Sequence, residues 1–228
     1  MASVRLGDYV TSPVQGGLAE TDYGRLAKFE LRDFLATWDE LHQSALAGLP
    51  ERVHSSAFVH PSAIIGGDVI IGPGVKVHEF STVRKGSVLC AGVSVGFNCE
   101  VTRAFLGEGA VLGHRIGVNS SVIGARAHLS ANVTIAAISM WSADMRKPDK
   151  EIFFRVPEGL YRCGTPVFGA LVGDDVQTGN GISLGPGVAL GRGCRVTGGV
   201  LLAARAVPRS SVVSAPDAHE ARVRQRRR

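Results

Sequence analysis

The sequence predicts a mainly β fold in which the chain winds as a parallel solenoid after a short helical region. Aliphatic residues recur every six positions over most of residues 59–202, and a fixed short period is typical of a β-solenoid. Gly often follows the aliphatic residue, which suits the tight corners of such a fold. Residues 22–46 instead repeat apolar side chains at intervals of three and four, the period of an amphipathic helix.

The region before the repeats is expected to be partly helical. Residues 1–21 show no strong period and are predicted to be irregular. The helix is predicted from about Asp22, as a candidate cap, to Leu46, and Gly48-Leu49-Pro50 is predicted to end it. We expect its apolar stripe to pack on the solenoid or on a neighbouring subunit. The stripe consists of Leu31, Phe34, Leu35, Trp38 and Leu41.

The first block of repeats runs from about Ser56 to Ile135. Three hexads make one triangular coil, so residues 18 apart are predicted to stack about 4.8 Å from each other. Val59, Val77 and Val95 form one such predicted column. Later in the block two intervals of five residues predict altered corners. These intervals end at Leu106 and Ile123.

Residues 137–169 break the pattern and predict an excursion from the solenoid, a type of segment that commonly carries function. The EIFFRV stretch within it is expected to form a short strand. A second block is predicted from Ala170 to about Ala206, and Pro208 is expected to stop it. The predicted organisation is therefore an N-terminal irregular and helical region at 1–52, a β-helix at 53–208 and a basic tail at 209–228.

Composition limits the function classes. The chain has 228 residues and a formal net charge of +5. The tail at 209–228 holds six arginines against Asp217 and Glu220. No aromatic residue interleaves these arginines, so we expect a solvated, disordered tail and regard nucleic-acid binding as unlikely. No apolar run reaches membrane-spanning length, and the start lacks a signal-peptide core. Cys99 and Cys194 occupy inward repeat positions, and reduced thiols favour a cytoplasmic protein.

A single solenoid would leave flat sides exposed. Rings of three prisms cover such sides and close on themselves, so we expect a homotrimer with sites between subunits.

Residues 83–124 carry motifs beyond the hexads. They read VRKG at 83–86, GFNCEVT at 96–102 and GHRIGVNSSVIG at 113–124. These motifs resemble R-P-G, G-N-F-V-E-x-K and G-H-x-x-Y-x-G-D-x-x-I-G in the acetyltransferase domain of bifunctional sugar-1-phosphate nucleotidyltransferase/glucosamine-1-phosphate acetyltransferase enzymes. The resemblance implies the left-handed parallel β-helix of the hexapeptide-repeat acyltransferases, with acetyl-CoA or another acyl-CoA as co-substrate. The chain has no nucleotidyltransferase fingerprint, so only the acyltransfer half is expected.

The resemblance also implies the site residues. His114 matches the general base, and an imidazole suits the removal of a proton from an amine at neutral pH. Arg84 matches the Arg that holds a sugar-nucleotide phosphate in this family, through its forked donors. The implied substrate-binding positions are Arg84, Glu100, Thr102 and His128, and the implied coenzyme A positions are Ala131, Asn180 and Gly198. No metal ion is expected.

The chain departs from the resembled family around the acceptor. Gly117 replaces a Tyr, Thr102 replaces a Lys and His128 replaces an Asn. The first hypothesis is an acyl-CoA-dependent N-acyltransferase acting on an amino sugar or on a sugar phosphate or nucleotide-like amine. The second is a non-catalytic, trimeric sugar-nucleotide-binding or scaffold protein. The third is a metal-dependent hydratase of the carbonic anhydrase type. It needs three imidazoles around one zinc, whereas His114 and His128 lie 14 positions apart.

Overall fold

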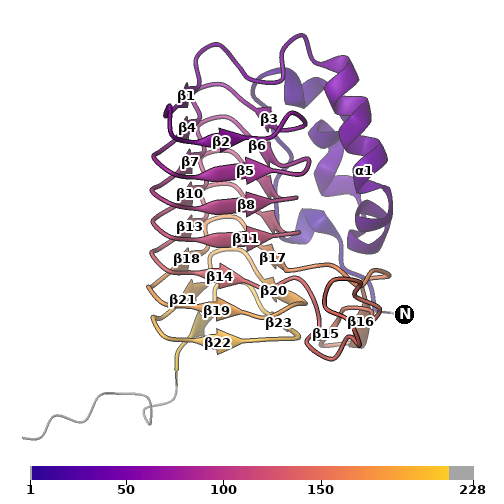
Figure 1. The fold of residues 1–228 in the computed structure, drawn as a ribbon. Helices are drawn as coiled ribbons and strands as arrows, with labels where there is room; N and C mark the ends of the chain where they lie inside the picture. Colours follow the sequence, from indigo (N-terminus) through magenta and orange to yellow (C-terminus); the bar gives the residue numbers. More distant parts are fainter. Residues whose placement is uncertain (1, 216–228) are drawn as a thin grey trace, which may run out of the picture.

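A computed structural model describes residues 2–215 of the chain. Three parallel sheets form the sides of a triangular prism, with an N-terminal layer along one side (Figure 1). The arrangement matches the left-handed parallel β-helix, so the predicted fold class is confirmed. Residues 216–228, which hold most of the predicted basic tail, lie outside the described residues.

The chain visits the three sheets in turn. Sheet 1 contains β1 (Phe58–Val59), β4 (Lys76–Val77), β7 (Ser94–Val95), β10 (Val111–Leu112), β13 (His128–Leu129), β18 (Gln177–Thr178), β21 (Arg195–Val196) and β24 (Val212–Val213). Sheet 2 contains β2 (Ile64–Ile65), β5 (Thr82–Arg84), β8 (Glu100–Thr102), β11 (Gly117–Asn119), β14 (Thr134–Ile135), β19 (Ser183–Leu184) and β22 (Leu201–Leu202). Sheet 3 contains β3 (Ile70–Ile71), β6 (Val88–Leu89), β9 (Phe105–Leu106), β12 (Val122–Ile123), β17 (Ala170–Val172), β20 (Val188–Leu190), β23 (Arg205–Val207), β15 (Phe153–Val156) and β16 (Gly159–Arg162).

The repeat positions form the core of the prism. Val59 pairs with Val77, and Val77 pairs with Val95, so the predicted column is confirmed. Val77 and Val95 are fully buried. Burial of each such aliphatic side chain stabilises the fold by about 1.5–3 kcal/mol. A coil of another length would turn these side chains outward and lose that energy.

The two irregular intervals shorten two coils by one residue. Leu106 pairs with Leu89, and Ile123 pairs with Leu106. The shortened corners contain Arg103 and Ser120, each with a φ of 45°. The prediction of altered corners is confirmed, because the paired residues of these coils lie 17 positions apart (106 − 89 and 123 − 106) instead of 18.

The N-terminal region differs from its prediction in three respects. The first is that residues 1–21, predicted to be irregular, hold two 3-10 helices. The region contains the 3-10 helices η1 (Leu6–Asp8), η2 (Gly17–Glu20) and η3 (Asp22–Lys28), and the helix α1 (Leu31–Gly48). The single helix predicted from Asp22 is thus two elements, because Glu30 has an extended backbone and forms an antiparallel bridge with Arg5. Thr21 rather than Asp22 caps η3, since its hydroxyl accepts a hydrogen bond from the Tyr23 N–H.

The N-terminal layer covers the outer face of sheet 3. Phe34 and Trp38 of α1 belong to a second hydrophobic cluster that also contains Phe105 and Leu171 of the sheet. Tyr23 stacks on Phe105 with the ring centroids 5.5 Å apart. The apolar stripe therefore packs on the solenoid, which was one of its two expected positions. The N-terminal layer leaves the outer faces of sheets 1 and 2 uncovered.

The excursion at 137–169 leaves the prism between β14 and β17. Its strands β15 and β16 form an antiparallel hairpin that extends sheet 3 beyond β23, so the strand expected in EIFFRV is confirmed. The stop expected at Pro208 is wrong, because β24 continues sheet 1 beside β21. Pro208 lies in a corner, where the missing N–H breaks no ladder hydrogen bond.

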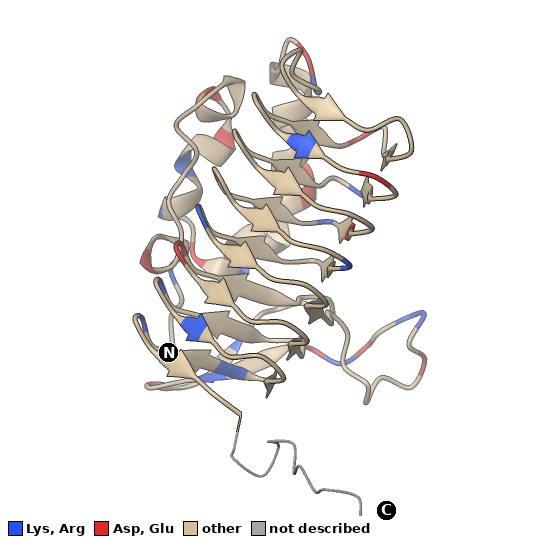
Figure 2. Ribbon diagram, turned by 90° about the vertical axis from the view of Figure 1, so that its left-hand side faces the viewer, with Lys and Arg blue, Asp and Glu red and all other residues tan. Residues whose placement is uncertain are grey.

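Few of the residues on the strands that face the viewer in Figure 2 are charged, and the charged residues beside these strands lie mostly in the corners. Within residues 2–215 no helix has both the length and the apolar character needed to cross a membrane.

Candidate functional site

The turns that join sheet 1 to sheet 2, here called the 1/2 corner, repeat one conformation in successive coils. Six of these turns hold a residue with a left-handed φ. Its N–H donates to a carbonyl in the preceding coil in every case but Phe80, whose N–H donates to the Ser62 hydroxyl at 3.0 Å. The Arg115 N–H donates to the Phe97 carbonyl, and the Asn132 N–H donates to the His114 carbonyl, both at 2.9 Å. The left-handed residues are Phe80 (58°), Asn98 (53°), Arg115 (54°), Asn132 (58°), Gly181 (67°) and Gly199 (75°).

The residue before each of these forms a second column along the same edge. His114 belongs to this column together with Ala131, Asn180 and Gly198, because the N–H groups of the following residues connect them in order. Successive members lie about 4.8 Å apart. The structure thus brings the predicted base and the three predicted coenzyme A positions onto one edge of the prism.

A polar cluster lies on the outer face of sheet 2. Arg84 pairs in register with Thr102, and its Nε donates to the Thr102 hydroxyl at 3.3 Å. The Arg84 guanidinium also forms an ion pair with Glu100. Thr102 is buried and its hydroxyl lies 3.5 Å from Glu100 Oε1. Three predicted substrate residues therefore form one connected group.

An open pocket of about 490 Å³ lies between this cluster and the 1/2 corner. Gly117 follows Glu100 in the ladder of sheet 2, and its missing side chain leaves space where the resembled family has a Tyr. His114 is exposed and does not line the pocket, although Arg115 after it does. Lining residues include Phe80, Asn98 and Arg115 from the corner and Arg84, Glu100 and Gly117 from sheet 2.

His128 lies apart from this cluster. It belongs to β13 of sheet 1, where it is exposed and pairs with Val111 on one side and Gln177 on the other. Arg84 and Glu100 are on sheet 2, so within one chain the predicted substrate residues occupy two faces of the prism.

Cys99 also lines the pocket, but its environment does not suit a nucleophile. Burial raises the pKa of its thiol above the ordinary value. The thiol donates to the carbonyls of Phe97 at 3.7 Å and Gly113 at 3.6 Å. A neutral, hydrogen-bonded thiol is a poor attacking group, so we assign Cys99 a structural role.

The hydratase hypothesis finds no support in the described part of the chain. Among residues 2–215 no three His, Cys, Asp or Glu side chains are grouped closely enough to hold a metal ion. His60 Nε2 lies 3.8 Å from Glu79 Oε1. One His and one Glu do not provide the three ligands that a zinc site needs.

The sequence interpretation missed the pocket residues of the 1/2 corner, which are Phe80, Asn98 and Arg115. A signal for them existed, because they occupy the corner position that Gly181 and Gly199 fill in later coils. A large or charged side chain at a position otherwise suited to Gly or Asn is uncommon. Large or charged residues with a left-handed φ also stand at other corners, as at Lys85, Arg103 and Arg126, so the signal is weak.

Comparison with known proteins agrees with this architecture. A family model described as "GMPPB C-terminal domain" matches residues 50–149. The fold and the repeats place the chain among the hexapeptide-repeat β-helix proteins. The carnitine operon protein CaiE from an Escherichia coli O7:K1 strain is 31% identical over 138 residues, which cover 52% of this chain and 70% of CaiE. CaiE from Escherichia coli SMS-3-5 is 32% identical over the same length. The chain belongs to the family of these CaiE proteins.

Solved structures share the fold at lower similarity. The perosamine N-acetyltransferase from Caulobacter crescentus in complex with CoA and GDP-perosamine is 18% identical, with a TM-score of 0.35. The match covers 79% of this chain and 62% of that one, so the chain spans about three fifths of that protein. AntD, an N-acyltransferase from Bacillus cereus, is 13% identical with a TM-score of 0.38, over 71% of this chain and 76% of AntD.

Proposed function

We propose that the chain is an acyl-CoA-dependent N-acyltransferase, with acetyl-CoA as the simplest donor and an amino sugar or a sugar phosphate as the acceptor. The position of His114 carries the proposal. This residue lies on the 1/2 corner beside the pocket that contains Arg84 and Glu100. Ala131, Asn180 and Gly198 continue the same edge toward the C-terminal coils. An acceptor in the pocket and a donor along the edge would therefore meet at His114.

The proposed reaction needs one base and no covalent enzyme intermediate. The acceptor nitrogen attacks the thioester carbonyl, a C–N bond forms and the C–S bond breaks. His114 takes the proton of the attacking amine, and the departing thiolate leaves as a free thiol after protonation. Backbone N–H groups near the corner would stabilise the developing oxyanion. Holding the two substrates side by side supplies much of the remaining rate enhancement.

The edge suits an extended donor. Ala131 and Gly198 present little or no side chain, and the Asn180 side chain is held because its Oδ1 accepts a hydrogen bond from the Ala131 N–H at 3.1 Å. A smooth edge of this kind would let a pantetheine arm lie close to the backbone. We infer that coenzyme A binds along it and directs its thioester toward His114.

The proposal includes a cytoplasmic homotrimer with each site between two subunits. Within one chain the His114 ring is exposed, and an exposed imidazole has nothing to orient it. The outer faces of sheets 1 and 2 are free of the N-terminal layer, so a second copy can approach the 1/2 corner from either side. A neighbouring chain would enclose both the imidazole and the donor.

The experiment is a thiol-release assay with acetyl-CoA and a panel of amino sugars and their phosphates. We expect His114→Ala to lower kcat by a factor of about 10²–10⁴, the usual contribution of a general base. His54→Ala, in the first coil, is the matched control and should leave the rate within about twofold of wild type. If no amine consumes the thioester, or if both variants behave alike, the proposal is wrong.

One set of observations favours the second hypothesis, a non-catalytic sugar-nucleotide-binding or scaffold trimer. Gly117 and Thr102 occupy positions where the resembled family has Tyr and Lys, so the acceptor side has lost two functional side chains. Calorimetry distinguishes the two hypotheses. Acetyl-CoA binding with turnover supports the enzyme, whereas binding of sugar nucleotides without acetyl-CoA binding supports the scaffold.

A further inference from the structure

The β15–β16 hairpin has a free face at the C-terminal end of the prism. Side chains alternate between the two faces of a strand, and Phe154 and Tyr161 are buried in the cluster under the N-terminal layer. Their neighbours therefore point to the opposite face, where all four are exposed. Figure 1 shows the hairpin beside the last coils, at the end of the prism from which the C-terminal trace leaves. The free face holds two apolar and two cationic side chains, which are Phe153, Arg155, Leu160 and Arg162.

Two arginines lie side by side at this end. Arg155 pairs in register with Arg205 of β23, so both side chains belong to the same face of the extended sheet. Within residues 2–215 no carboxylate forms a salt bridge with either guanidinium. Like charges at paired positions destabilise a sheet. The pair therefore suits an anionic partner that would neutralise both charges.

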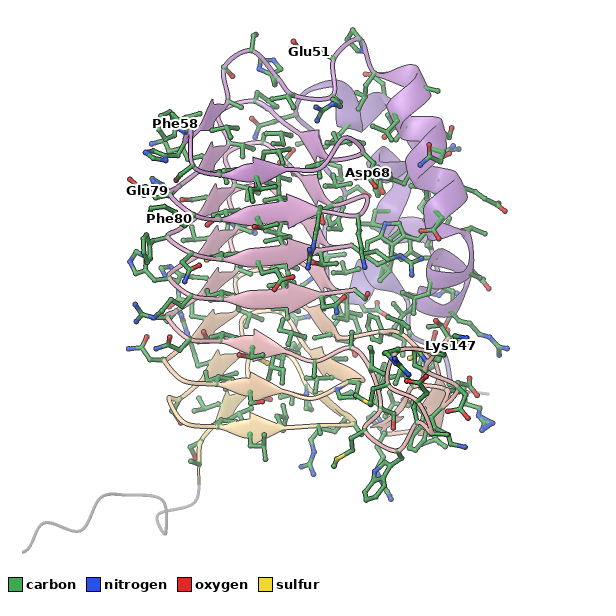
Figure 3. All side chains as sticks on the ribbon, in the orientation of Figure 1. Glu51, Phe58, Asp68, Glu79, Phe80 and Lys147 are labelled. Atoms are coloured by element: carbon green, nitrogen blue, oxygen red, sulfur yellow. The ribbon has the colours of Figure 1, made fainter. Side chains whose placement is uncertain are left out.

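The loop that precedes the hairpin, residues 139–150, adds an exposed aromatic side chain. Trp141 is 78% exposed, and Met140 beside it is exposed as well. In the described part of the chain Lys147 forms no salt bridge. Figure 3 shows Lys147 next to the hairpin, and Phe58 at the opposite end of the prism. Exposed Trp next to free cations is typical of surfaces that lie at a membrane interface.

Exposed apolar residues and positive charge are concentrated at this end of the molecule. Residues 139–162 and 195–215 contain seven of the twelve large apolar side chains that are exposed within residues 2–215. They include Leu201 and Val212 on the last strands of sheets 2 and 1. Together with residues 216–228, these ranges carry a formal charge of +7, whereas the whole chain carries +5, so the rest of the chain is at −2.

We propose that the C-terminal end of the prism docks on an anionic lipid surface. Trp141, Phe153 and Leu160 enter the interface between the headgroups and the acyl chains. Arg155 and Arg205 bind lipid phosphates through their forked donors. The contact is with the membrane surface and needs no spanning segment. It is separate from the proposed acyl transfer.

Charge and side-chain type favour lipid over other partners. A second copy is a poor partner, because two such ends would bring their positive charges together. A nucleic acid would use the arginines but would leave Leu160, Leu201 and Val212 in water, since bases stack on flat rings. An anionic lipid surface satisfies both the cations and the aliphatic side chains.

The experiment uses the emission of Trp141 in the full chain. The chain has two tryptophans, and Trp38 is only 2% exposed, so a change in emission on binding reports Trp141. Vesicles contain either phosphatidylcholine alone or phosphatidylcholine with about one third phosphatidylglycerol. Co-sedimentation with the vesicles gives the partition coefficient.

Four variants separate the contributions. Trp141→Ser removes the exposed ring, and Arg155→Gln removes one charge of the arginine pair. Phe58→Ser and Lys76→Gln are the matched controls, because they remove an exposed aromatic residue and an exposed cation from the first coils. Thermal unfolding of every variant checks the fold.

We expect binding to the anionic vesicles, with a blue shift of the emission, and little binding to phosphatidylcholine alone. Trp141→Ser should lower the partition coefficient about tenfold, and Arg155→Gln about fivefold. Both controls should bind like wild type. The thermal stability of Arg155→Gln should be unchanged or higher, because the substitution removes a like-charge contact.

The inference is overturned if the protein does not bind the anionic vesicles, or if it binds both kinds of vesicle equally. It is also overturned if Trp141→Ser binds like the Phe58→Ser control. A blue shift that appears with rising protein concentration in the absence of vesicles would make this end a contact between copies. Tighter binding to a single-stranded oligonucleotide than to the anionic vesicles at the same salt concentration would make the partner a nucleic acid.

Discussion

Tyr161 joins the β15–β16 hairpin to the start of α1, and removing its hydroxyl measures how firmly the excursion is attached. The hydroxyl donates to Glu30 Oε1 at 2.6 Å and accepts from the Arg32 N–H at 2.8 Å. The Arg32 N–H keeps a second acceptor, Glu30 Oε2 at 2.7 Å. In Tyr161→Phe the main loss is therefore one hydrogen bond to a carboxylate, which contributes about 1.5–3 kcal/mol.

The assay is thermal and urea unfolding followed by circular dichroism. A loss of about 2 kcal/mol corresponds to a Tm lower by roughly 4–8 °C in a chain of this size. Tyr9→Phe is the control, because among the described residues no hydrogen bond involves the Tyr9 hydroxyl. If the two variants lie within about 0.5 kcal/mol of each other, the attachment through Glu30 is not what stabilises the hairpin.

Ionisation of Tyr161 also makes the free energy of unfolding depend on pH in the alkaline range. Burial, followed by the neighbouring Glu30, raises the pKa of Tyr161 above its ordinary value. An unfolded tyrosine releases its proton from about pH 10, whereas the folded one retains it. The unfolded state then binds fewer protons, so the free energy of unfolding falls as the pH rises above about 10. Tyr161→Phe should lessen this fall relative to wild type, and an unchanged pH profile would contradict the assignment.

Three further substitutions test the packing of the fold. Asp174→Asn removes a buried carboxylate 3.5 Å from the Arg192 guanidinium and should cost about 1–2 kcal/mol, because the guanidinium stays partly in solvent. Proteolysis within residues 7–15 should be faster, and equal proteolysis would contradict the role of this pair. Gly96→Ala should destabilise by at least about 2 kcal/mol, because a Cβ there would lie 1.7 Å from the Gly113 carbonyl oxygen. Gly48→Ala, where a Cβ meets nothing within 4 Å, should stabilise α1 by about 0.5–1 kcal/mol. If urea unfolding showed that both Gly variants change the free energy of unfolding in the same direction, the reasoning would be contradicted.

The interior of the prism was predictable because its register depends on local spacing. Inward residues such as Val77 and Val95 must recur at the coil length, and the sequence shows that period directly. The break before α1 was not predictable in the same way. It depends on the bridge between Arg5 and Glu30, a tertiary contact that outweighs the local helical pattern. The strand after Pro208 was missed because proline interrupts a strand but is compatible with a corner.

The candidate site was predictable in part. Arg84, Glu100 and Thr102 were identified through a motif resemblance, and the coil spacing brings them together. Phe80 and Arg115 were missed because corner side chains lie outside the repeat of inward residues.

The contacts of the N-terminal segment determine when this protein can finish folding. The backbone of Thr11 is hydrogen-bonded to Asp174, 163 positions later in the chain, and the Gly7 carbonyl accepts from Arg192. Coils can form one after another as the ribosome delivers them, but residues 7–11 cannot complete their contacts until the sixth coil has been made. Translation that stops before Asp174 would therefore leave the apolar face of sheet 3 incompletely covered and open to chaperones or to aggregation.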